Sequence, residues 1–152
     1  MTTRTERGAL SRPRREARHR AREAAVQMLY QWEIGRDPID EVLAGFWCHS
    51  SSPLPEDLRE FAATLARGVV TSVETLDPPI AAAAENWRIE RMNVMDRLIL
   101  RLAVYEFQHQ PDTPALVVIN EALELARTFS TDDAVRFING ILDGIRKTTE
   151  RE

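Results

Sequence analysis

Hydrophobic residues along this chain recur with the period of an α-helix. Apolar side chains stand repeatedly at i, i+3, i+4 and i+7, the spacing that places them on one face of a helix. Ile39, Val42, Leu43 and Phe46 are one such set. No segment of the sequence alternates apolar and polar residues for long enough to indicate a strand. The pattern therefore predicts an all-α fold of about seven helices.

Glycine, proline and polar residues separate the expected helices. The helices cover roughly residues 13–34, 38–47, 56–76, 77–87, 94–109, 117–129 and 134–145. Asp77 and Pro78 are expected to end one helix and begin the next, with Trp87 facing the core. Ser130 and Asp133 resemble a capping box at the start of the last helix.

Two features predict how the helices pack. The segment 94–109 is apolar on almost every side, as expected of a central, buried helix. Gly68 lies inside the helix expected over 56–76, where glycine is unfavourable for helix formation. This glycine predicts the close approach of a neighbouring element.

The composition is that of an ordinary globular domain, with 152 residues, 43% of them hydrophobic and 29% charged. We expect a single helical domain over residues 15–146, preceded by a disordered arginine-rich arm at 1–14 and followed by a frayed tail at 147–152. Cys48 is the only cysteine, which excludes an intrachain disulfide. No apolar run approaches the roughly 18 residues that span a bilayer. No secretory signal is recognised either, so a cytoplasmic protein is expected.

Charge is distributed unevenly over the chain. Residues 1–22 contain eight arginines and two glutamates, whereas the remaining residues contain twelve basic and twenty-two acidic side chains. Arg14, Arg18 and Arg22 stand four apart, so we expect a row of guanidinium groups in water beside the apolar stripe. A basic end on an acidic body predicts an anionic partner there, and arginine suits phosphate because it binds bidentately and stays charged. The alternative is a solvated face without a partner.

The residue patterns of catalytic and metal sites are missing from the sequence. The six glycines build neither a GxGxxG nor a GxxxxGK[ST] phosphate loop. His19, His49 and His109 are far apart and lack the spacing of a zinc site. We therefore expect a protein without catalytic residues, cofactor or metal.

Two aromatic residues have more than one interpretation. Tyr30 lies off the apolar stripe of its helix, so its ring is expected either in ordinary surface packing or against RNA bases or a protein partner. Phe137 lies on the apolar stripe of the last helix, which favours a core position over a platform for a base.

Several stretches taken together resemble the NusB family of bacterial transcription antitermination and ribosome-biogenesis factors. They are RHRAREAA at 18–25 with LYQW at 29–32, LILRLAVYE at 98–106, INEA at 119–122 with Leu125 and Ala126, and FINGILD at 137–143. The resemblance covers about residues 15–145 and implies an all-helical fold of two packed subdomains. It also implies a non-enzymatic protein that, with the ribosomal protein NusE, binds the single-stranded RNA element boxA. The pair helps RNA polymerase to read through terminators in ribosomal RNA operons.

The same resemblance implies site residues. RNA binding is assigned to the basic stretch and to two residues of the last helix: Arg14, Arg15, Arg18, His19, Arg20, Arg22, Asp133 and Phe137. His19 stands where an arginine is usual. Contact with the partner is assigned to Tyr30, Glu90 and Asp96, where an acidic patch would meet a basic ribosomal protein. We expect Asp96 near the exposed start of its helix. Family members differ between monomer and homodimer, so the oligomeric state stays open.

Two other functions fit some of these features. NusB-like domains also form the N-terminal, RNA-guiding part of RNA cytosine methyltransferases. Those enzymes need a following Rossmann-type domain with a glycine-rich loop, so this alternative requires a truncated chain. The other alternative is a purely protein-binding helical module whose basic arm is incidental.

Overall fold

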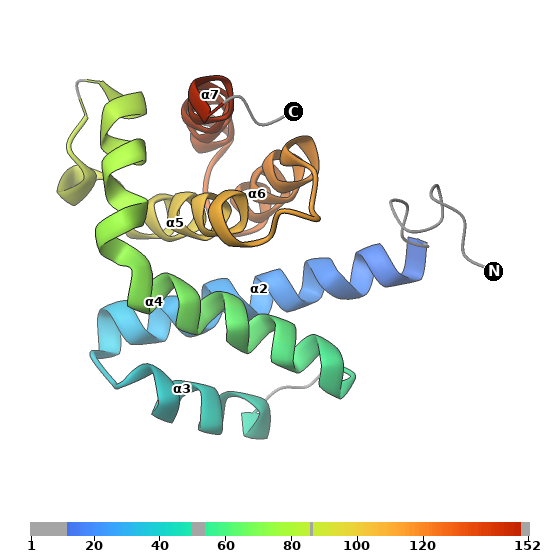
Figure 1. Ribbon diagram of the computed structural model, residues 1–152. Helices are drawn as coiled ribbons and strands as arrows, with labels where there is room; N and C mark the ends of the chain where they lie inside the picture. The colour runs from blue at the N-terminus through green and yellow to red at the C-terminus, as the bar shows by residue number, and fades with distance from the viewer. Residues whose placement is uncertain (1–11, 50–53, 86, 150–152) are drawn as a thin grey trace.

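The computed structural model describes residues 12–49, 54–85 and 87–149, and every regular element in these ranges is helical. The helices are α2 (Arg12–Gly35), α3 (Ile39–Phe46), α4 (Glu56–Ala84), α5 (Val94–His109), α6 (Ala115–Phe129) and α7 (Asp132–Thr149). Two short 3-10 turns, η1 (Trp47–His49) and η2 (Ile89–Arg91), follow α3 and α4. The all-α prediction is confirmed (Figure 1).

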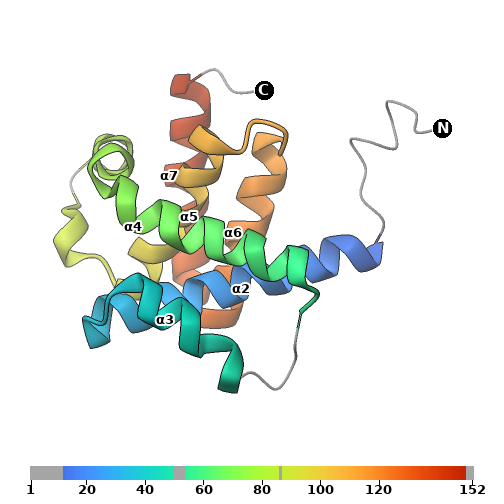
Figure 2. The ribbon, with the colours of Figure 1, turned by 60° about the horizontal axis from the view of Figure 1, so that its bottom comes forward.

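The helices form two packed groups that share α4. In one group, α2 and α3 pack with the first half of α4; in the other, α5, α6 and α7 pack together, and the second half of α4 lies against α7 (Figures 1 and 2). Helix α5 contacts α2, α4, α6 and α7. Every residue from Leu98 to Phe107 is buried, so the prediction of a central helix is confirmed.

The predicted helix boundary at Asp77 and Pro78 is wrong, because α4 continues through both Pro78 and Pro79. Proline has no N–H, so Pro79 leaves the carbonyl of Thr75 without its usual donor within the helix. The side-chain amide of Gln108 on α5 donates to that carbonyl at 3.1 Å. Figure 1 shows α4 changing direction between its two halves, as prolines inside a helix cause.

Asp77 contacts α5 rather than capping a helix. Its two carboxylate oxygens accept hydrogen bonds from Nε and Nη2 of Arg101, at 2.8 and 2.9 Å. Nη1 of Arg101 also lies 3.7 Å from a carboxylate oxygen of Glu33 on α2. The buried guanidinium of Arg101 therefore holds the middle of α4 against α5. This contact stabilises a continuous helix at Asp77 instead of a helix end.

The end of α4 decides the position of Trp87. The helix ends at Ala84, and Glu85 has a left-handed backbone with φ of 55°. Beyond this point the helical period no longer applies, and Trp87 is 56% exposed. The expectation that Trp87 faces the core is therefore wrong.

The start of α7 is capped one residue later than predicted. Thr131, not Ser130, accepts a hydrogen bond from the backbone N–H of Ala134 through its hydroxyl, at 3.1 Å. The hydroxyl of Ser130 donates instead to Oδ1 of Asp96 on α5, at 2.6 Å. Ser130 thus joins the α6–α7 connection to the first turn of α5.

The ends of the chain are more helical than the expected boundaries. Residues 1–11 of the expected arm lie outside the described residues, but Arg12–Arg14 belong to α2. Helix α7 runs to Thr149, into the segment expected to fray. Asp143 accepts from Nη2 of Arg146 at 2.8 Å and lies 3.1 Å from Nζ of Lys147, and these pairs support the last turns.

Gly68 provides a test of the packing between α4 and α5. A Cβ atom added there would overlap the ring and hydroxyl of Tyr105, which confirms the predicted close approach. Gly68→Ala should lower the free energy of unfolding by about 1–3 kcal/mol in urea denaturation, because the overlap must be relieved. The matched control is Gly140→Ala in α7, where no atom lies within 4 Å of the added Cβ. It should raise stability by about 0.5–1 kcal/mol. Equal effects of the two variants would contradict the packing argument.

Candidate nucleic-acid interface

The first turns of α2 present a cluster of arginines at the surface. Arg15 and Arg20 are exposed, and Arg14 and Arg18 are partly exposed. Nη2 of Arg14 donates to Oδ2 of Asp57 at 2.7 Å. The guanidinium of Arg18 lies 4.1 Å from the ring centroid of Phe61. We call these four side chains, Arg14, Arg15, Arg18 and Arg20, the α2 arginine cluster.

Arg22 does not belong to this surface, so the expected row of three solvated guanidiniums is wrong at its third member. Only 3% of Arg22 is exposed. Its Nε and Nη2 donate to the two carboxylate oxygens of Glu106 on α5, at 2.8 and 2.9 Å. Nη1 also reaches Oε1 of Glu121 on α6, at 3.4 Å. Position 22 lies where α2 packs on α5 and α6. The spacing of arginines along α2 does not reveal this packing.

Charge pairing keeps this buried group ionised. Burial opposes the charge of Arg22, but hydrogen bonds and Coulombic attraction from Glu106 and Glu121 outweigh burial and raise its pKa. For Glu121, burial likewise opposes ionisation, and the hydrogen bond from His19 and the charge of Arg22 together lower its pKa. Arg22 and its two carboxylates therefore act as a structural connection between α2, α5 and α6.

His19 extends this connection toward the surface. Its ring Nδ1 lies 2.7 Å from Oε1 of Glu121, and its Nε2 lies 3.4 Å from Oε2 of Glu23. The hydrogen bond to Glu121 is the main cause that raises the pKa of His19, against a smaller opposing effect of burial. Both ring nitrogens are thus directed at carboxylates.

Burial and a neighbouring arginine both change the pKa of Arg18 in the α2 arginine cluster. Partial burial lowers the pKa of Arg18, and the charge of Arg22 acts in the same direction. Because an arginine pKa begins far above neutrality, a guanidinium remains a cation under ordinary conditions.

The two expected RNA-binding residues of α7 lie at its first turns. Asp133 is exposed and accepts a hydrogen bond from Nη2 of Arg136 at 2.6 Å. Phe137 is partly buried against the core. Its ring also packs edge-to-face on Trp87, with centroids 5.9 Å apart and planes at 72°. Phe137 is therefore both a core contact and the neighbour of an exposed aromatic ring.

The residues expected to bind a protein partner have different surroundings. Tyr30 is 42% exposed, and Glu90 is exposed on η2. Asp96 is only 9% exposed, and its carboxylate accepts a hydrogen bond from the hydroxyl of Ser130. The expectation that Asp96 lies at an exposed helix start is wrong, because this side of the first turn of α5 faces the connection between α6 and α7.

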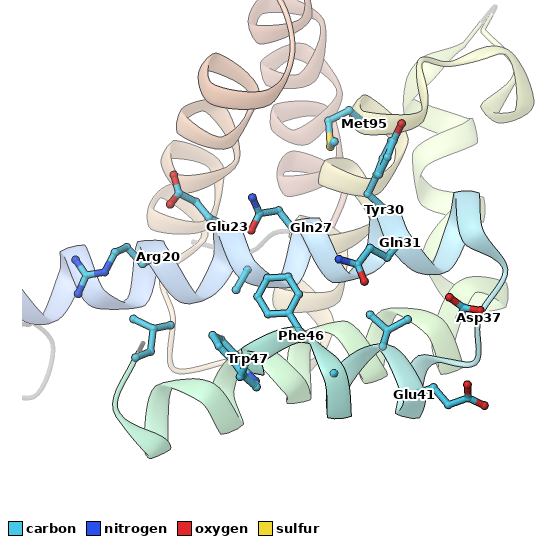
Figure 3. Close-up of a pocket in the computed structure, with 14 residues that line it drawn as sticks. Arg20, Glu23, Gln27, Tyr30, Gln31, Asp37, Glu41, Phe46, Trp47 and Met95 are labelled. Carbon is cyan, nitrogen blue, oxygen red and sulfur yellow. The ribbon is translucent and has the colours of Figure 1, made fainter. Parts of the chain in front are cut away.

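Tyr30 lies beside an open groove of about 840 Å³ that sequence reasoning missed. Figure 3 shows Arg20, Gln27 and Tyr30 along α2, with Phe46 and Trp47 on the facing segment. The last two rings pack edge-to-face, with centroids 5.1 Å apart. Exposed Gln27 and Gln31 lie beside these two aromatic rings, and such a surface is suited to contact a protein chain.

Metal-binding groups and membrane-spanning helices were sought in the part of the chain that the structure describes. In residues 12–49, 54–85 and 87–149, no group of three or more His, Cys, Asp or Glu side chains is placed to hold a metal ion. None of the helices in these ranges is long and apolar enough to cross a membrane.

Comparison with known proteins identifies the family. The NusB family model matches residues 19–147. The chain belongs to the NusB family. The transcription antitermination protein NusB of Koribacter versatilis is 44% identical over 135 residues, which cover 89% of this chain and 92% of that protein. NusB of Symbiobacterium thermophilum is 46% identical over 136 residues, covering 85% and 88%.

Solved NusB structures have the same fold. NusB of T. maritima superposes with a TM-score of 0.78 at 34% identity, covering 86% of this chain and 90% of that one. A crystal structure of the antitermination factors NusB and NusE in complex with dsRNA contains a chain with a TM-score of 0.79 at 25% identity, covering 88% and 98%. Membership of the NusB family places this protein among antitermination factors and not among enzymes.

The connection made by Arg22 can be tested by its removal. Arg22→Ala should lower the free energy of unfolding by about 3–5 kcal/mol, because it leaves the buried carboxylate of Glu106 without a partner. The measurement is urea denaturation followed by circular dichroism. Arg20→Ala is the matched control, since this side chain is exposed on the same helix, and it should change stability by less than about 0.5 kcal/mol. A loss of similar size in both variants would show that Arg22 is not a structural residue.

Proposed function

We propose that this NusB-family protein binds single-stranded boxA-type RNA together with the ribosomal protein NusE. On transcripts of ribosomal RNA operons, the complex promotes read-through by RNA polymerase and supports ribosome biogenesis in the cytoplasm. The observation that carries the proposal is the α2 arginine cluster at the surface of a NusB fold. The crystal structure of NusB and NusE with dsRNA supports RNA and NusE as the partners.

The α2 arginine cluster binds the RNA backbone in this proposal. Arg15 and Arg20 are exposed, and the partly exposed Arg14 and Arg18 extend the basic surface. Guanidinium groups bind phosphate in a bidentate manner and carry their charge at any ordinary pH. Arg22 contributes indirectly, since its buried ion pairs hold α2 in the orientation that turns the cluster outward.

His19, Asp133 and Phe137 complete the proposed RNA surface. The raised pKa of His19 keeps its ring protonated to a higher pH than in an ordinary histidine, and the protonated ring offsets the carboxylates of Glu23 and Glu121 beside the α2 arginine cluster. The exposed carboxylate of Asp133 can accept hydrogen bonds from base amino groups. The partly buried ring of Phe137 offers its outer edge to a base.

The partner protein binds the groove beside Tyr30 in this proposal, and this groove meets the α2 arginine cluster at Arg20. Tyr30 combines an exposed ring with a hydroxyl, the kind of side chain that interfaces favour. The groove beside it carries Asp37 and Glu41 at one end, and Glu90 is exposed on η2. Acidic groups complement a basic ribosomal protein and steer its approach. Asp96 supports this surface through Ser130 and does not contact the partner directly.

Phosphate binding by the α2 arginine cluster can be measured from salt dependence. Each phosphate contact on a single strand contributes about 0.7 to the slope of log affinity against log salt concentration. Arg15→Ala combined with Arg20→Ala should therefore flatten this slope by roughly 1.4 units for a boxA-like single-stranded RNA. The control is Arg67→Ala with Arg127→Ala, two exposed arginines on α4 and α6. If both double variants retain the affinity and slope of the wild type, the cluster is only a solvated face.

The partner surface can be tested without RNA. Tyr30→Ala should weaken binding of NusE by about tenfold or more in titration calorimetry, because exposed tyrosines are frequent hot spots. Leu116→Ala is the control, since Leu116 is a comparably exposed large side chain on α6. An unchanged affinity of Tyr30→Ala for NusE would remove Tyr30 and its groove from the interface.

A further inference from the structure

Trp87 is a large aromatic side chain that lies exposed at the surface, just beyond the end of α4. Trp32 and Trp47 are partly buried against the core, whereas Trp87 is 56% exposed. An exposed indole offers a large π-face on which a nucleic-acid base can stack. The side chain lies between the end of α4 and the 3-10 turn η2.

Backbone hydrogen bonds form on both sides of Trp87. Its N–H donates to the carbonyl of Ala84 at 3.2 Å, which closes the end of α4. On the other side, the N–H of Arg91 donates to the carbonyl of Arg88 at 3.0 Å and forms η2. Trp87 thus lies between two backbone hydrogen bonds, and its ring contacts Phe137 of α7 edge-to-face.

Charged neighbours of this ring pair favour nucleic acid over a purely apolar ligand. Arg88 follows Trp87 directly, and Arg136 precedes Phe137. Arg136 is held by Asp133. In the part of the chain that the structure describes, no ion pair or side-chain hydrogen bond is found for Arg88, which is exposed. An exposed aromatic ring and the exposed arginine that follows it in sequence offer the two groups with which proteins bind single strands, a face that stacks a base and a cation that contacts phosphate.

We infer that Trp87 is a base-stacking residue for single-stranded RNA. A base stacks on the exposed face of the indole, Phe137 supports the ring, and Arg88 lies beside the base for its phosphate. The inference rests on the proposed function and extends the proposed RNA surface from Phe137 to Trp87. Because every base has a π-face, this contact adds affinity with little dependence on the RNA sequence.

The test compares Trp87→Ala, Trp87→Phe and wild type with a boxA-like single-stranded RNA. Trp87→Ala should weaken binding about tenfold or more, and Trp87→Phe should keep most of the affinity because a ring remains. The salt slope should equal that of the wild type in both variants, because stacking neutralises no phosphate. Leu116→Ala is the control for removal of an exposed apolar side chain. Circular dichroism confirms the fold of each variant.

Fluorescence gives a second measurement that needs no change at position 87. In the Trp32→Phe, Trp47→Phe variant, Trp87 is the one remaining tryptophan. Its emission should be quenched as RNA is added and should saturate at the concentration where binding saturates. Emission that stays constant through the full titration would show that no base stacks on Trp87.

The outcomes separate this inference from the function on which it rests. If the wild type does not bind the RNA, both fail. If the wild type binds and the Arg15→Ala, Arg20→Ala variant shows the flattened salt slope, but Trp87→Ala retains full affinity and the Trp32→Phe, Trp47→Phe variant shows no quenching, only the stacking inference fails. If Trp87→Ala weakens binding of NusE and leaves RNA affinity unchanged, the surface is a protein contact and the inference is overturned.

Discussion

The buried ion pair between Arg22 and Glu106 is the interaction on which the functional surface depends. Both side chains are buried, so each needs a hydrogen-bonded partner of opposite charge, which the other provides. The pair joins α2 to the central helix α5 and fixes the rotation of α2 about its own axis. That rotation directs Arg15 and Arg20 outward, so a contact in the core determines where the basic surface lies.

Helix α5 organises the rest of the fold through its few polar residues. Four of them form hydrogen bonds with neighbouring elements. Glu106 pairs with Arg22 of α2, and Arg101 pairs with Asp77 of α4. Gln108 supplies the donor that the prolines of α4 remove, and Asp96 accepts from Ser130 between α6 and α7. Apolar packing makes the core stable, and these contacts select the arrangement.

The arginines discussed above have two different roles, one in the core and one at the surface. Arg22 and Arg101 are buried and paired with carboxylates on other helices, where they connect elements. Arg15 and Arg20 are exposed on the same helix as Arg22, seven and two residues before it. Spacing along a helix does not distinguish the two roles, because i and i+4 share a face but the depth of that face changes where another helix packs on it.

By itself, the sequence determined the helical class, the central position of α5, the close packing at Gly68 and the family, because apolar periodicity and local motifs are properties of neighbouring residues. Only the tertiary structure decided which charges are solvated. Arg22 and Asp96 are buried by helices that lie far away in the sequence. The continuity of α4 through Pro78 and Pro79 also depends on α5, through Gln108 and Arg101. The exposure of Trp87 follows from the end of α4 three residues earlier. The burial of Arg22 and Asp96 and the continuity of α4 depend on partners distant in the sequence, whereas the helical period used to place Trp87 does not apply past the end of α4.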